Sequence, residues 1–344
     1  MFPRFFYAQT LCKRRKICYN KTMSNSRKNT TQSNNQGVIG SFLGRPTAAK
    51  ASGLTFSLAA VLPTGLSLIF LICVQIFGLN RAEDYMQKDW YIYAGFLITP
   101  TAFALIALWC LYWTKTPLKQ AICAQRCSWK YYLIAIVLQI GLFSLSQLNT
   151  WFLEFLGRFG YQPNEISLPS MDGFGLFGVL FAVAVLPALF EEIIFRGVLL
   201  SGLKSFGKAG AVLLCGGLFA LYHQSPEQTA YQFCCGAAFA LVAVRAGSIF
   251  PTVIAHFLNN AVIIILTKFS LESFPTPVLI AVMAVSAVCL ISSLAYLCLF
   301  DGEKTWDKAE QKKERARFFV CAAVGLSICS LTWISGLLMG FTGR

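Results

Sequence analysis

The six residues Glu-Glu-Ile-Ile-Phe-Arg at positions 191–196 place two adjacent carboxylates and a guanidinium inside an apolar run of residues 173–203. Charged side chains at membrane depth are energetically expensive and are usually functional. The surrounding chain has the composition of a membrane protein, because 56% of its residues are hydrophobic and only 13% are charged. We therefore predict an all-α fold, a polytopic transmembrane helical bundle.

Apolar runs on both sides of this stretch set the number of spans. Roughly twenty helical residues cross the hydrocarbon core of a bilayer. The chain has nine such runs, of which the fifth and sixth are short, so we predict eight or nine spans. The runs cover residues 54–79, 90–113, 131–149, 173–203, 209–223, 229–244, 249–267, 276–300 and 319–340.

The distribution of Lys and Arg predicts the orientation of these spans. With a cytoplasmic N-terminus, 23 of the 29 basic residues lie in inner segments and five in outer segments, as the positive-inside rule requires. The net charge of +14 is therefore attributed to topology and contacts with membrane lipid, and no nucleic-acid partner is expected. We expect an integral, multi-pass membrane protein, which in a bacterium would reside in the plasma (inner) membrane.

Charge and composition divide the chain into four parts. Residues 1–52 carry ten basic residues and no acidic ones, which predicts a disordered cytoplasmic tail. Residues 53–172 are expected to form N-terminal transmembrane helices followed by an aromatic-rich interfacial segment. Residues 173–268 form the predicted catalytic core. Residues 269–344 are predicted to be C-terminal transmembrane helices with a charged cytoplasmic linker at 301–317.

Four polar residues are predicted to share one depth in the bilayer. A rise of roughly 1.5 Å per residue places Glu191, His223, His256 and Asn260 about 10–22 Å from the inner ends of their helices. His223 and His256 are the two histidines of the chain. A single histidine in a membrane bundle is more often an interhelical hydrogen bond than a catalyst. Two histidines at the level of the carboxylates instead favour a buried site.

Local spacing predicts how the charged stretch is arranged. Glu192 and Arg196 are four residues apart in the order that favours an ion pair on one helix face, which alone would be explained as a structural tie. Glu191 lies about 100° around the helix from Glu192 and can face a different neighbour. Pro187 removes a backbone donor and pushes on the carbonyl of residue 183, so a kink is expected there, with room for water beside Glu191.

Such a set of side chains suits peptide hydrolysis. A carboxylate and a histidine can take a proton from water and return it to a leaving group. A second histidine and an asparagine amide, here His256 and Asn260, which share a helix face, can donate hydrogen bonds to an oxyanion. No H-E-x-x-H motif is present. No metal ligands are assigned, although Glu191, His223 and His256 remain possible ligands of a divalent metal such as zinc.

Three motifs, E-E-x-x-x-R, F-x-x-x-H and H-x-x-x-N, occur in this order at residues 191–196, 219–223 and 256–260. In these residues the chain resembles the CAAX prenyl endopeptidase and bacteriocin-processing (CPBP, or Abi) family of intramembrane proteases. The resemblance covers residues 173–266. It implies an endopeptidase that hydrolyses a CAAX-type C-terminal or other membrane-delivered peptide, with a peptide or lipidated protein as substrate.

The resemblance also implies roles for six residues: water activation by Glu191 and His223, oxyanion support by His256 and Asn260, and support of the site by Glu192 and Arg196. On this mechanism no cofactor is required. Family members have also been described as metalloproteases, so a dependence of the reaction on zinc stays an alternative. Two alternatives belong to other functional classes. One is a non-catalytic membrane adaptor or bacteriocin-immunity protein of the same fold. The other is a proton-coupled transporter, against which the lack of internal duplication argues.

Overall fold

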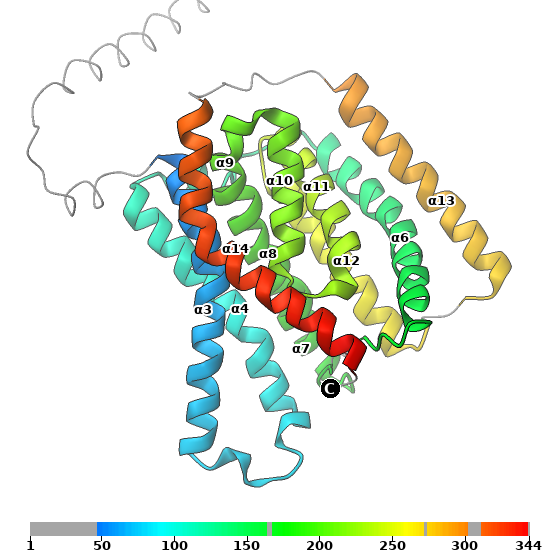
Figure 1. Cartoon of the computed structure of the whole chain (residues 1–344). Helices are drawn as coiled ribbons and strands as arrows, with labels where there is room; N and C mark the ends of the chain where they lie inside the picture. The colour runs from blue at the N-terminus through cyan, green and yellow to red at the C-terminus, as the bar shows by residue number, and fades with distance from the viewer. Residues whose placement is uncertain (1–46, 164–166, 272–273, 302–310, 343–344) are drawn as a thin grey trace, which may run out of the picture. The chain divides into compact units, whose positions relative to one another are not determined.

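The computed structural model describes residues 47–163, 167–271, 274–301 and 311–342. These residues form helices and no strand, which confirms the all-α prediction. Eight stretches within the described ranges are long and apolar enough to cross a membrane. The principal helices are α3 (Ala48–Ile76), α4 (Asp89–Thr114), α6 (Lys130–Gly157), α7 (Gly175–Val179), α8 (Leu186–Glu192), α9 (Leu200–Gly202), α10 (Gly207–Tyr222), α11 (Thr229–Ala246), α12 (Phe250–Lys268), α13 (Thr276–Ala295) and α14 (Gln311–Thr342) (Figure 1).

The longest apolar stretch, Gly175–Tyr222, folds back on itself. A short 3-10 turn at Leu203–Phe206 ends at Gly207, whose φ of 77° is accessible because glycine has no Cβ. After this turn α10 runs back beside the preceding helix, with the Phe195 and Phe219 ring centroids 5.0 Å apart. The predicted spans at 173–203 and 209–223 are the two arms of this hairpin.

Two helices begin earlier than the hydropathy pattern predicts. The α3 helix starts at Ala48, inside the predicted tail, where the Thr47 hydroxyl accepts a hydrogen bond from the Lys50 N–H (3.3 Å). The α14 helix starts at Gln311, inside the predicted charged linker. Both extensions are polar or small in sequence, so they lack the apolar signal by which the spans were recognised. Residues 1–46 and 302–310 lie outside the described residues.

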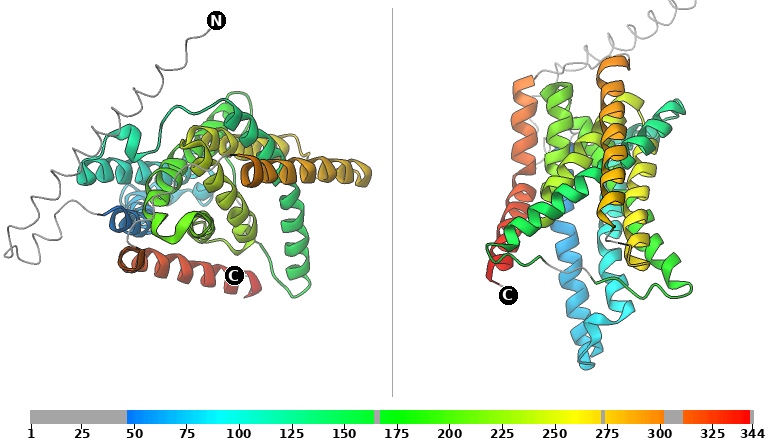
Figure 2. Two further views of the ribbon diagram at one scale, coloured as in Figure 1. Left: turned by 90° about the horizontal axis from the view of Figure 1, so that it is seen from above. Right: turned by 90° about the vertical axis from the view of Figure 1, so that its right-hand side faces the viewer.

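The α6 helix is also longer than predicted. It continues from the apolar run through the first part of the predicted interfacial segment and ends at Gly157. Its last turns carry exposed aromatic side chains, including Trp151 and Phe155. This helix packs against α12 and α13, and α13 lies on the side of the bundle away from α3 (Figure 2).

A central group of helices, α8 and α10 to α12, is flanked by α3, α4, α6 and α14. Glycines allow α10 and α11 to approach closely, since a Cβ on Gly216 would lie 2.7 Å from the backbone nitrogen of Ala237. Small residues at such contacts are typical of membrane helix pairs. Large apolar side chains such as Leu108 and Ile291 are instead exposed on outer helices, as expected for surfaces in contact with lipid.

Candidate functional site

A cavity of about 900 Å³ lies among the central helices. Its lining includes Glu191, His223, His256 and Asn260, the four residues predicted from sequence to be catalytic. Residues of α3 and α4 complete the wall opposite the histidines' helices. The other three residues of the motifs, Glu192, Arg196 and Phe219, are fully or almost fully buried and are not part of the lining. The structure therefore brings together side chains from three segments of sequence at one cavity.

The carboxylates lie on a short α-helix between two π-helical segments. The seven residues of α8 follow a π-helix at Leu180–Val185 and precede another at Ile193–Leu199. Such wide turns occur frequently at functional sites because they redirect side chains. The first of them lies beside Pro187, where the sequence predicted a kink.

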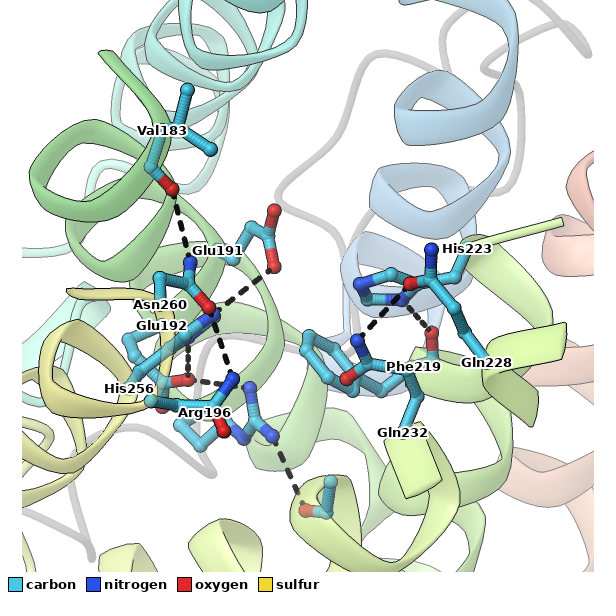
Figure 3. Close-up of polar contacts among 12 residues, drawn as sticks. Val183, Glu191, Glu192, Arg196, Phe219, His223, Gln228, Gln232, His256 and Asn260 are labelled. Atoms are coloured by element: carbon cyan, nitrogen blue, oxygen red, sulfur yellow. Dashed lines mark hydrogen bonds and ion pairs between the residues drawn. The ribbon is translucent and has the colours of Figure 1, made fainter. Parts of the chain in front are cut away.

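The side chain of Asn260 compensates for this proline. Pro187 has no N–H that could donate a hydrogen bond to the carbonyl of Val183, four residues earlier. The Asn260 amide on α12 donates a hydrogen bond to that carbonyl over 3.1 Å (Figure 3). One of the two N–H groups of Asn260 is used in this contact. The contact explains how a proline can stand beside the carboxylates without leaving a buried carbonyl unpaired.

Glu192 and Arg196 form the ion pair that their spacing predicted. The Arg196 Nη1 lies 2.6 Å from the Glu192 Oε1, and both side chains have no exposed surface. A second guanidinium nitrogen, Nη2, donates to the backbone carbonyl of Gly236 (3.3 Å). The guanidinium also lies over the Phe219 ring, 4.4 Å from its centroid. This pair joins α8 to α10 and α11 beneath the cavity.

His256 lies between the two carboxylates. Its Nδ1 is 3.0 Å from the Glu192 Oε1, and its Nε2 is 3.8 Å from the Glu191 Oε2. A carboxylate that pairs with a guanidinium accepts hydrogen bonds, so Nδ1 is the protonated nitrogen and donates. The longer distance exceeds that of a hydrogen bond. Glu192 thus orients the ring, and Nε2 faces Glu191.

Glu191 has a different environment from its neighbour. It is 8% exposed and lines the cavity, and no group among the described residues hydrogen-bonds its Oε2. A buried acceptor without a partner is costly to maintain and is commonly satisfied by water in polar cavities. The prediction that the two glutamates face different neighbours is confirmed. The geometry makes Glu191 the carboxylate that can contact a molecule in the cavity.

His223 follows the last residue of α10, at the cavity wall. Its Nδ1 is 2.8 Å from the Phe219 carbonyl, which can only accept, so Nδ1 carries a proton and Nε2 is the basic nitrogen. The Phe219 ring contacts both histidine rings, at 4.6 Å from His223 and 6.0 Å from His256. Figure 3 shows His223 across this ring from the cluster around His256. Phe219, the first residue of the F-x-x-x-H motif, thus positions His223 through its backbone carbonyl.

Sequence reasoning missed a hydrogen-bond network behind Asn260. The Asn259 amide donates to the Asn260 Oδ1 over 3.0 Å. Its own oxygen accepts from the Tyr231 hydroxyl (2.7 Å) and from the Gln139 amide (2.9 Å). The Val183 carbonyl can only accept, which fixes the orientation of the Asn260 amide and, through it, that of the Asn259 and Gln139 amides in this network. Gln139 carried a usable signal, since it is a polar residue within the apolar run at 131–149.

Comparison with known families addresses the same segment. Residues 173–262 match the family model for type II CAAX prenyl endopeptidases of the Rce1-like kind. This segment is therefore similar to the Rce1-like endopeptidases. The match confirms the resemblance inferred from the three motifs, and at family level it supports an intramembrane protease. No curated protein and no solved structure gave a significant match to the chain.

The matched segment supplies the proposed catalytic residues of the cavity lining, and the surrounding chain supplies much of the rest. Ala59 and Pro63 of α3 and Thr99 and Pro100 of α4 line the cavity but precede the matched segment. The eight apolar stretches and the family match together support an integral, multi-pass membrane protein.

The structure also tests the fit of a metal. Within the described ranges, no three His, Cys, Asp or Glu side chains are grouped closely enough to hold a metal ion. Glu191, His223 and His256, considered from sequence as possible zinc ligands, therefore do not form a metal site in this arrangement. His256 uses Nδ1 to bond Glu192, and the His223 ring lies apart from it. The steps derived below accordingly use the side chains of the chain itself.

Proposed function

We propose that this protein is an intramembrane endopeptidase that hydrolyses a peptide bond in a CAAX-type or other membrane-delivered substrate, using water activated by Glu191 and His223. One observation carries the proposal. Glu191, whose Oε2 has no hydrogen-bond partner among the described residues, lines the cavity that is also lined by His223, His256 and Asn260. The Rce1-like match to residues 173–262 supports the same reaction class.

Water activation follows from the environments of Glu191 and His223. The Glu191 carboxylate accepts a proton from water, and the basic Nε2 of His223 provides a second acceptor in the cavity wall. The hydroxide equivalent attacks the substrate carbonyl carbon and forms a tetrahedral intermediate. When that intermediate collapses, the C–N bond breaks and the proton held by the general base passes to the leaving nitrogen.

The oxyanion is assigned to Asn260 and His256. Asn260 donates one N–H to Val183 and retains a second for the oxyanion. His256 donates Nδ1–H to Glu192, so its Nε2 can donate to the oxyanion when that nitrogen also carries a proton. In this proposal Glu192 and Arg196 are positioning residues that act through His256.

The test is cleavage of a dye-labelled farnesylated CAAX peptide by detergent-purified protein. Loss of a general base lowers kcat by about 10²- to 10⁴-fold, which is the expected result for Glu191→Gln and for His223→Ala. Glu154→Gln provides the matched control, because Glu154 is exposed on α6 and is not part of the cavity lining. Equal activity of Glu191→Gln and wild type would refute the assignment. An adaptor would show no cleavage by any variant, and a transporter would show flux driven by a pH gradient.

A strong chelator tests the metal alternative in the same assay. The proposed mechanism predicts that wild-type activity persists in chelator. Loss of activity with recovery on addition of zinc would contradict it and would make Glu191 and the histidines metal ligands in the active state.

A further inference from the structure

Two glutamines at the start of α11 line the cavity without a role in the chemistry above: Gln228 is the residue before the helix and Gln232 lies in its first turn. Gln228 and Gln232 are both partly buried, and both belong to the apolar stretch Pro226–Ala246. Uncharged polar side chains within membrane spans are typically used for hydrogen bonding inside the bundle or toward a polar cavity. Here they face the cavity that contains the proposed catalytic residues.

The pair is arranged to present one donor and one acceptor. Gln232 Nε2 donates to Gln228 Oε1 over 3.3 Å, as the four-residue spacing on a helix allows. This contact leaves the Gln228 N–H groups and the Gln232 carbonyl oxygen for other partners. Reversing both amides leaves the Gln228 oxygen and the Gln232 N–H groups instead. Either orientation therefore offers one donating and one accepting group, about one helical turn apart.

The helical register connects this pair to the base of the site. Gly236 follows Gln232 by a further four residues and lies on the same face of α11. Its carbonyl accepts the hydrogen bond from Arg196, and a Cβ on it would lie 3.1 Å from the Phe219 side chain. The start of α11 at Gln228 and Gln232 thus lines the same cavity as His223, and the next turn reaches the buried ion pair (Figure 3).

The charge of the cavity indicates what this face can bind. Among the described residues that line it there is no Lys or Arg, and Glu191 is the one acidic residue. Neutral amides therefore make up much of the polar surface around the proposed catalytic groups. An extended peptide displays the N–H and C=O of one residue along the same edge, which matches one acceptor and one donor.

We propose that Gln228 and Gln232 bind the main chain of the substrate in an extended conformation beside the scissile bond. This proposal rests on the proposed function, because it places the substrate of that reaction. In this proposal the two glutamines bind backbone groups of the substrate and not its side chains. The site should therefore accept different residues at the bound position.

Binding is measured with the Glu191→Gln protein, which holds the substrate without cleaving it. The probe is the dye-labelled farnesylated CAAX peptide, titrated by fluorescence anisotropy in detergent. Each uncharged hydrogen bond is worth about two- to tenfold in Kd. Gln232→Met or Gln228→Met, which retain side-chain length, should raise Kd by this factor. Gln120→Met is the matched control, since Gln120 is exposed on the short helix α5 (Leu118–Ala121) away from the cavity lining.

A substrate change separates direct contact from an indirect effect on folding. When Gln232 Nε2 donates to Gln228 Oε1, the Gln232 carbonyl is the group that accepts from the peptide. Replacing one backbone N–H of the peptide by an ester oxygen, residue by residue, then removes the donor that Gln232 is proposed to bind. At one position the ester should weaken binding to the Glu191→Gln protein by about two- to tenfold, and it should have no further effect once Gln232→Met is present. Additive losses at every position would overturn the proposal, as would an unchanged Kd in the Met variants or no binding of the peptide at all.

The two proposals fail in different ways. If the wild type shows no cleavage dependent on Glu191, the proposed function fails. If cleavage depends on Glu191 but the ester and Gln232→Met effects do not couple, the peptidase assignment is retained and the glutamine proposal fails.

Discussion

Replacing Glu192 with Gln is expected to destabilise the protein strongly, whereas the same replacement at Glu191 is expected to leave its stability nearly unchanged. The two residues are adjacent and chemically identical. They differ in their partners. Glu192 accepts hydrogen bonds from Arg196 and His256, while the Oε2 of Glu191 has no hydrogen-bond partner among the described residues. The experiment therefore tests whether the two carboxylates have separate functions.

The magnitudes follow from burial. The Glu192 and Arg196 side chains have no exposed surface, and their ion-pair distance is 2.6 Å. Removing one member of a buried pair leaves the other charge uncompensated and costs about 3–5 kcal/mol. Glu191→Gln exchanges a buried charge for a neutral amide, so the change should not exceed about 1 kcal/mol, the value of one ordinary hydrogen bond.

The assay is thermal unfolding of detergent-purified variants, followed by intrinsic fluorescence. Glu192→Gln should lower the midpoint by more than about 5 °C. The double variant Glu192→Gln, Arg196→Met should recover much of that loss, because it removes both charges. Equal midpoints for the two single Gln variants, or a Glu191→Gln variant less stable than Glu192→Gln, would refute the reasoning.

Two further predictions concern polar contacts at other places in the bundle. Asn260→Ala should cost about 1–3 kcal/mol by leaving the Val183 carbonyl without its donor, and the loss should be smaller in a Pro187→Ala background, where residue 187 supplies a backbone N–H; identical losses in both backgrounds would contradict the proposed compensation. Burial by itself raises the pKa of Asp301, but the hydrogen bond from Lys130 (2.7 Å) holds that pKa below its ordinary value. Its stabilising contribution should therefore be complete above about pH 4 and disappear as the pH falls through the lowered pKa, so unfolding midpoints of wild type and Asp301→Asn should converge in acid and differ near neutrality.

Much of the site could be predicted because its signals are local. Apolar runs of sufficient length predicted the helices, and a four-residue spacing predicted the pair between Glu192 and Arg196, since helix geometry alone brings such residues together. The three short motifs predicted the Rce1-like match at residues 173–262. Helix ends were predicted less well, because the first turns of α3 and α14 are not apolar.

Tertiary packing decided which side chains meet between helices. The sequence showed that Pro187 deprives the carbonyl of residue 183 of its donor, but only the packing of α12 against that helix showed that Asn260 replaces it. The same holds for His256, whose position between two carboxylates depends on a neighbouring helix.

The sequence by itself therefore determined that this is a helical membrane protein with Glu191, Glu192 and Arg196 on one helix and a histidine on each of two others. Only the tertiary structure decided that one carboxylate faces a cavity and the other a guanidinium, and that Gln228 and Gln232 face the same cavity. The physical reason is that spacing along a helix is set by its backbone hydrogen bonds. Contacts between helices depend on the rotation, depth and close approach of each pair, to which residues throughout the bundle contribute.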